Sequence, residues 1–194
     1  LMDEPLSNLD AKLRRQVRED IREIQQKLGV TTIYVTHDQE EALAISDKVI
    51  VMNNAVIAQD GNPKDLYNFP KNKFVANFIG DANVVKAEIV SKQSNTYELK
   101  LAEMRIKIES DKNLENSVSV ALRPEKIRIE TTNNNNCIHA SVNNASFVGS
   151  NYQYIFNSDI GKLYVISGDT NHVFKVGEKV FLSLDEKDVK ILND

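Results

Sequence analysis

The chain has 194 residues, of which 41% are hydrophobic and 27% charged, and its formal net charge at pH 7 is −4. This charge argues against a general nucleic-acid binder, which needs a basic surface, and no apolar run reaches the length of a membrane span. A single cysteine, Cys137, excludes an internal disulfide and a cysteine-rich metal site.

The first eighty residues alternate between strand and helix patterns. The chain opens with an apolar pair that leads straight into Asp3 and Glu4, as though it began at the end of a core strand. We therefore expect it to be part of a longer protein. Apolar residues then recur at steps of three and four from Leu13 to Leu28, which predicts an amphipathic helix that Gly29 ends.

A second strand and a short helix are expected next. The β-branched run TTIYVT predicts a strand that delivers the chain to His37. Asp38 and Glu41 have the spacing of a helix N-cap and its capping-box partner, so a short helix through residues 42–45 should follow.

A hairpin and two further helices complete this part. Residues 47–61 predict two strands joined at Asn53-Asn54, because asparagine tolerates the positive φ of a tight turn. Asn62 before Pro63 predicts a helix start. Residues 74–79 carry an apolar helical face, with Gly80 as the stop.

Beyond Gly80 the pattern changes to short alternating segments separated by turns rich in Asn, Asp and Gly. Many short strands at regular spacing predict a small barrel or sandwich. The run TTNNNN at residues 131–136 is expected to be an exposed loop between the halves of this module. We place a domain boundary near residue 80. The nine segments predicted as strands beyond this boundary are VVKAEIV, TYELKL, MRIKIE, SVSVAL, KIRIE, HASVNNASFV, YQYIF, KLYVIS and KVFLSL.

Polar residues at the ends of the two predicted strands point to phosphate chemistry. In P-loop ATPases an aspartate after an apolar strand holds Mg²⁺ and the adjacent glutamate polarises the attacking water, which matches Asp3 and Glu4. The alternative is a charged exit from a strand. A right-handed strand–helix–strand crossover makes the two strands parallel, so His37 and Glu4 would face one phosphate from the same sheet edge.

Three stretches resemble the ATP-binding subunits of ABC importers that carry a C-terminal regulatory module: LMDEPLSNLDAKLR, VTHDQEEALAISDKVIVMN and QDGNPKDLYNFPKNKFVANFIG. The resemblance covers residues 1–80. It implies that Asp3 is the Mg²⁺-coordinating Walker B aspartate, Glu4 the catalytic glutamate and His37 the switch histidine that contacts the γ-phosphate. It also places Ser7 and Asp10 in the D-loop, which reaches across the ATPase dimer.

The second part is similar to the transport-associated OB-like β-barrel (TOBE) of the same branch, through VSVALRPEKIRI, FVGSNYQYIF and KVGEKVFLSLDEKDVKIL. Arg123, Pro124 and Glu125 stand where that module shows such a triplet. Two readings stay open: a turn at Pro124 across which Arg123 and Glu125 pair, or direct contact with a substrate or effector. The alternating aromatic residues of positions 152–156 are expected to fill a sheet face rather than to stack on bases.

The resulting fold class is α/β, a partial P-loop ATPase domain with a remnant of a parallel sheet (1–80), followed by an all-β OB-like barrel (81–194). Two departures from the family are conservative: Ala55 replaces a hairpin glycine and Asn62 replaces a threonine. The chain contains no G-x-x-x-x-G-K-[ST] phosphate loop, no signature motif and no helical subdomain. We therefore expect this chain alone not to hydrolyse ATP.

In the full-length protein, the resemblance implies a transport-coupled ATPase that uses ATP and Mg²⁺. It would work as a homodimer on membrane permease subunits at the cytoplasmic face of the membrane, and indirectly with an external substrate-binding protein, while the fragment itself would be soluble. Overall likeness favours a polyamine (spermidine or putrescine) as the substrate, with ferric iron and sugars as alternatives. Two other classes remain: a stand-alone regulatory, dimerisation or ligand-sensing module, and an OB-type nucleic-acid binder, against which the charge argues.

Overall fold

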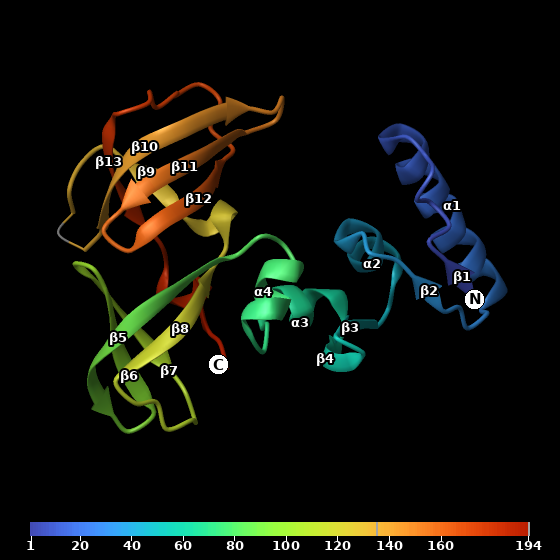
Figure 1. Cartoon of the computed structure of the whole chain (residues 1–194), viewed down its shortest axis with the longest axis horizontal. Helices are drawn as coiled ribbons and strands as arrows, with labels where there is room; N and C mark the ends of the chain where they lie inside the picture. Colours follow the sequence, from blue (N-terminus) through green and yellow to red (C-terminus); the bar gives the residue numbers. More distant parts are fainter. Residues whose placement is uncertain (135, 194) are drawn as a thin grey trace. The chain divides into compact units, whose positions relative to one another are not determined.

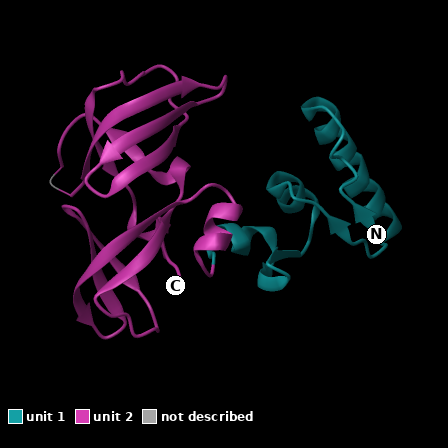
Figure 2. Cartoon of the chain, viewed as in Figure 1, with its two compact units in different colours: residues 1–70 teal, residues 71–194 magenta. Residues whose placement is uncertain are grey.

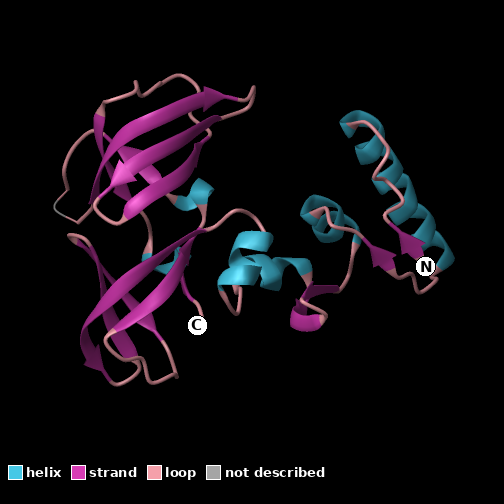
Figure 3. Ribbon diagram, in the orientation of Figure 1, coloured by secondary structure: helices cyan, strands magenta, loops and turns pink. Residues whose placement is uncertain are grey.

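The computed structural model describes residues 1–134 and 136–193 (Figure 1). The chain forms two compact units, Leu1–Pro70 and Lys71–Asp194 (Figure 2). The first contains helices and short strands, and the second is mostly β-sheet (Figure 3). The division precedes helix α4 (Lys73–Phe78), because this helix contacts strands of the second unit. The limits of the two sequence domains remain a prediction.

The first unit begins with a strand, a helix and a second strand. β1 (Met2–Asp3) pairs in parallel with β2 (Tyr34–Val35), and α1 (Ala11–Leu28) connects them. Gly29 ends α1 in the left-handed conformation, at φ 64°, as the sequence predicts. β2 is shorter than the predicted strand, since within the described residues it pairs only with the two residues of β1.

The apolar face predicted for α1 is only partly covered, since Val17 and Ile21 are half-buried. No residue of this helix is buried, and Leu13, Ile24 and Leu28 are exposed. An apolar stripe of this kind normally packs against another element.

The rest of the first unit follows the predicted order. α2 (Gln39–Ile45) is followed by β3 (Val49–Asn53), β4 (Val56–Gly61) and α3 (Pro63–Asn68). The antiparallel β3–β4 hairpin turns at Asn54 and Ala55, both with positive φ, one residue later than predicted. The Asn62 side chain accepts a hydrogen bond from the Asp65 N–H and caps α3 as expected.

The second unit contains two antiparallel sheets of five strands each within the described residues. All nine predicted strands are present, and one three-residue strand, β14, was not predicted. The first sheet has the order β14-β8-β5-β6-β7: β5 (Asn83–Gln93), β6 (Thr96–Leu101), β7 (Met104–Glu109), β8 (Ser117–Leu122) and β14 (Val189–Ile191). The second has the order β12-β11-β10-β13-β9: β9 (Arg128–Glu130), β10 (Ile138–Phe147), β11 (Tyr152–Ser158), β12 (Gly161–Ser167) and β13 (Lys179–Ser183).

Both sheets contribute to one hydrophobic core. Tyr154 and Phe156 of β11 are fully buried in it, which confirms that this aromatic run fills a sheet face. The side chain of Asn83 joins the two sheets: its amide donates to the carbonyl O of Tyr164 on β12, and its carbonyl accepts from the Tyr164 N–H, both at 2.7 Å.

The loop at residues 131–136 connects β9 to β10, two strands of the same sheet, rather than joining the two sheets. Residue 135 of this loop lies outside the described residues. Within the described part of the chain, no helix has both the length and the apolar character needed to cross a membrane.

Candidate functional site

The ends of β1 and β2 bring Glu4 and His37 together. Glu4 follows β1 directly, and its N–H donates to the Val35 carbonyl O at 2.8 Å, which extends the parallel ladder by one residue. Nδ1 of His37 then lies 2.8 Å from Oε1 of Glu4. The sequence predicted this meeting of the two side chains at one sheet edge.

Glu4 leaves the strand with an unusual backbone. Its φ is 43°, in the left-handed region that residues with a Cβ seldom occupy. The turn carries its side chain out of the pleat, and the carboxylate stays about half exposed, at 47%. Strained backbone at an accessible acid is typical of functional positions.

The Glu4 carboxylate changes the chemistry of His37. The hydrogen bond between them, and then their charge interaction, raise the pKa of the imidazole above its ordinary value of 6.5. The ring is otherwise open to solvent, with 74% of the side chain exposed. Because Nδ1 is engaged by Glu4, Nε2 is the nitrogen left to meet a ligand.

Asp3 offers a single exposed carboxylate at the same strand end. Among the described residues, no three His, Cys, Asp or Glu side chains gather into a metal site. One carboxylate does not suit zinc or calcium, but it fits Mg²⁺, which keeps several waters and shares phosphate oxygens of its substrate.

Residues 5–10 join Glu4 to α1 and include the segment of residues 7–10, the predicted D-loop. Ser7 is exposed, and its N–H donates to the Glu4 carbonyl O at 3.3 Å. The Asp10 carboxylate caps α1 by accepting from the N–H groups of Lys12 and Leu13, each at 3.0 Å. This cap fixes the start of α1, and the proposed D-loop roles of both residues remain predictions.

Glu41 has a different role from the one its spacing predicts. A capping box would direct its carboxylate to the N–H of Asp38, but that N–H donates to Oγ1 of Thr36 at 3.0 Å. Oε2 of Glu41 accepts instead from the hydroxyls of Tyr34 and Thr36, and the residue is only 3% exposed. The hydroxyls at positions 34 and 36, spaced two apart on the strand before this acid, were the signal in the sequence.

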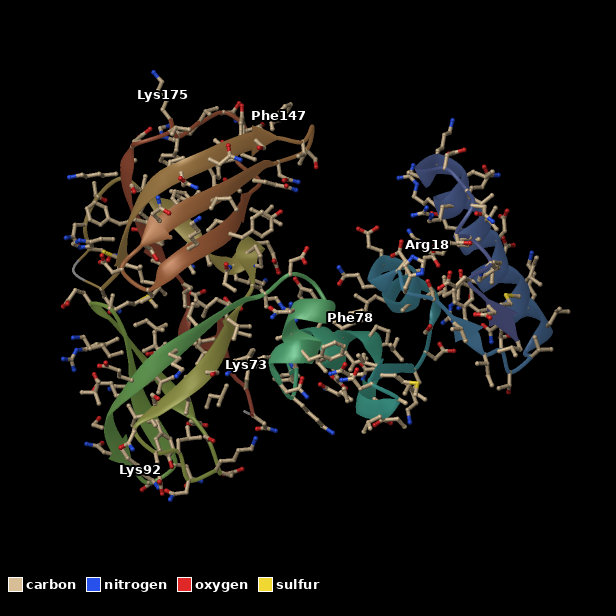
Figure 4. The ribbon with its side chains drawn as sticks, in the orientation of Figure 1. Arg18, Lys73, Phe78, Lys92, Phe147 and Lys175 are labelled. Carbon is tan, nitrogen blue, oxygen red and sulfur yellow. The ribbon has the colours of Figure 1, made fainter. Side chains whose placement is uncertain are left out.

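A surface pocket of about 400 Å³ lies beside the N-cap of α2. Four of its seven lining residues are cations of α1, and one of them, Arg18, is labelled in Figure 4. The lining consists of Ala11, Lys12, Arg14, Arg15, Arg18, Asp38 and Glu40.

Comparison with known proteins adds an independent observation. The model of the TOBE domain family matches residues 120–192. The chain is 39% identical over 193 residues to the Fe(3+) ions import ATP-binding protein FbpC of Agrobacterium fabrum, and 38% identical over 199 residues to that of Fusobacterium nucleatum. Both alignments include the whole of this chain. These relatives are ATP-binding subunits of ABC importers, and the chain is similar to them over its whole length.

The chain spans about half the length of these ABC importer subunits, 54% and 52% respectively. Their names give Fe³⁺ as the imported ion and do not support the predicted polyamine. A solved structure of the cytoplasmic molybdate-binding protein ModG has a TM-score of 0.46 and 9% identity, covering 55% of this chain and 92% of that one. A likeness this low carries no argument about function.

Proposed function

We propose that this chain is the part of an ABC importer ATPase that carries the catalytic glutamate and the switch histidine, and that the importer transports ferric iron. The contact of 2.8 Å between His37 and Glu4 supports the ATPase site, because the two residues meet at one edge of a parallel strand pair. The names of the relatives support ferric iron.

The chemistry divides among three side chains. Glu4 shares Oε1 with His37 and keeps Oε2 to polarise the attacking water. His37, whose pKa the Glu4 carboxylate raises, would donate from Nε2 to the γ-phosphate. Asp3 would hold Mg²⁺, which when bound neutralises the charge that develops on the phosphate oxygens of ATP.

The remaining parts of the proposal concern the assembly. Ser7 and Asp10 would contact the nucleotide site of a second copy, so that two subunits enclose ATP. This dimer would drive membrane permease subunits supplied by an external binding protein. The exposed apolar face of α1 gives the rest of the full-length subunit a surface to pack on.

The ATPase proposal is tested with Glu4→Gln in the full-length subunit. Glu4→Gln keeps the size of the side chain but removes the base, so the rate of ATP hydrolysis should fall on the order of 10²- to 10⁴-fold while ATP binding persists. Glu19→Gln, an exposed carboxylate on α1, is the matched control and should leave the rate unchanged. Full activity in Glu4→Gln would contradict the assignment.

The substrate is tested separately, in cells. Deletion of the gene should abolish uptake of radiolabelled ferric iron and leave spermidine uptake unchanged. The opposite pattern would restore the polyamine alternative. Loss of neither uptake, together with no ATPase activity, would favour a stand-alone regulatory module.

A further inference from the structure

Arg14 of α1 reaches two segments of the candidate site. Its Nη2 donates to the carbonyl O of Leu9 at 3.1 Å, within the segment of residues 7–10. Its Nη1 donates to Oδ2 of Asp38 at 3.4 Å, next to His37 in the chain. One guanidinium therefore connects the predicted D-loop to the residue that follows the predicted switch histidine.

Glu41 completes this connection from α2. Its Oε1 lies 3.7 Å from Nε of Arg14, and its Oε2 accepts from Tyr34 and Thr36. A buried carboxylate is unfavourable unless charge and hydrogen bonds compensate it, so these donors hold it in one place. Burial and the hydrogen bond to Glu41 raise the pKa of Tyr34, which keeps the phenol protonated as a donor.

The two hydroxyl donors bracket the end of β2. Tyr34 lies in that strand and Thr36 directly precedes His37. By holding both hydroxyls, Glu41 fixes the path of the backbone that presents the imidazole to Glu4. The guanidinium of Arg14 pairs with the same carboxylate and also donates to the carbonyl O of Leu9 in the D-loop segment.

We propose that Arg14 and Glu41 are positioning residues that hold the segment of residues 7–10 and His37 in one fixed arrangement, so that ATP hydrolysis depends on their ion pair. The inference rests on the proposed function of Glu4 and His37. Neither residue contacts the nucleotide in this proposal, and each acts through the backbone and the groups it holds.

Arg14 could also serve only to join α1 to α2, and a second arginine of α1 makes such a connection without reaching the candidate site. Arg22 lies eight residues further along α1, and its Nη1 donates to the carbonyl O of Ile45 at 2.9 Å. Its Nη2 donates to Oδ1 of Asp47 at 2.6 Å. Arg22 thus holds the far end of α2 without touching the candidate site, and Arg22→Ala is the matched control.

The test measures ATP hydrolysis by the full-length subunit and its variants. Arg14→Ala should lower kcat about 10- to 100-fold, as a misplacement of about 1 Å can do, with KM for ATP within about twofold. Arg14→Lys keeps a charge but loses the planar fork, and should show a smaller loss in a folded protein. Glu41→Gln should also lower kcat, and combining it with Arg14→Ala should add little, because both act through one arrangement.

A second measurement does not depend on activity. The ring ¹⁵N shifts of His37 at pH 7 report its protonation and its partner, and Glu4→Gln gives the shifts of the ring without the carboxylate. Arg14→Ala should move the shifts toward those of Glu4→Gln, whereas Arg22→Ala should leave them at wild-type values. Removal of a nearby cation acts in the opposite direction, since it favours the protonated ring, so the direction of the change separates the two causes.

Two results would overturn the inference: wild-type shifts and kcat in Arg14→Ala, or equal losses in Arg14→Ala and Arg22→Ala. If Glu4→Gln leaves hydrolysis intact, the proposed function fails. In that case the shifts of His37 still decide whether Arg14 positions the ring.

Discussion

The guanidinium of Arg123 lies at the C-terminal end of α4, where its Nη1 donates a hydrogen bond of 2.6 Å to the carbonyl O of Ile79. The same nitrogen also donates to the carbonyls of Ala76 and Gly80, each at 3.1 Å. The last carbonyls of a helix have no partner within it, and a buried cation there satisfies them and opposes the helix dipole. Arg123 therefore attaches α4 to the strands of the second unit.

Arg123→Ala should lower the free energy of unfolding by about 3 kcal/mol, because Arg123 is only 6% exposed and its loss leaves buried carbonyls unpaired. Urea denaturation followed by circular dichroism measures this. Arg128→Ala removes an exposed ion pair with Asp185, and it should cost less than about 1 kcal/mol. An unaffected stability in Arg123→Ala would instead favour the reading in which Arg123 contacts a substrate or effector.

The pKa of His37 should fall when the Glu4 carboxylate is removed. The hydrogen bond to Glu4 is the largest cause of the raised pKa, so Glu4→Gln should return it toward 6.5. Because the pKa of His37 is raised in the folded state, its protonation adds to the free energy of unfolding at pH values below its pKa in the unfolded chain. This contribution is lost as the pH rises through the folded-state pKa. Titration of the imidazole by NMR gives the value directly. Asp38→Asn should change the pKa less, because the charge of Asp38 is a smaller cause.

The hairpin of β3 and β4 predicts a stabilising substitution. Asn54 and Ala55 have φ values of 49° and 64°, which is the pattern of a type I′ turn. Alanine is strained there and glycine is not, so Ala55→Gly should raise the free energy of unfolding by about 0.5 kcal/mol after the entropy cost of glycine. Ala145→Gly, at a position of β10 that pairs with Tyr154 of β11, is the control and should destabilise by about 0.5–1 kcal/mol. A loss of stability in Ala55→Gly, measured by denaturation, would contradict the assigned turn.

Local patterns predicted the elements well because their causes are local. The stop at Gly29 and the caps at Asp38 and Asn62 depend on hydrogen bonds within a few residues, and all three are present. The meeting of Glu4 with His37 followed from the handedness of a single crossover.

The contacts that were not predicted join residues far apart in sequence. Arg123 contacts Ile79 at the end of a helix, 44 residues away in the chain. The local sequence Arg123-Pro124-Glu125 does not predict this contact. The buried Glu41 carboxylate accepts hydrogen bonds from the hydroxyls of Tyr34 and Thr36 rather than from the nearby N–H of Asp38. Tertiary packing overrides a local motif wherever it offers a stronger partner.

The core of the second unit predicts the largest loss of stability. Phe156 has no exposed surface and stacks on Tyr154 with ring centroids 5.5 Å apart. Phe156→Ala removes this contact and leaves a cavity between the two sheets, so the free energy of unfolding should fall by about 3–5 kcal/mol. Phe147→Ala, at a ring that is 57% exposed, should cost less than about 1 kcal/mol, although it also loses a contact with Tyr152. Equal losses in the two variants, measured by urea denaturation, would mean that β11 does not present Phe156 to the shared core.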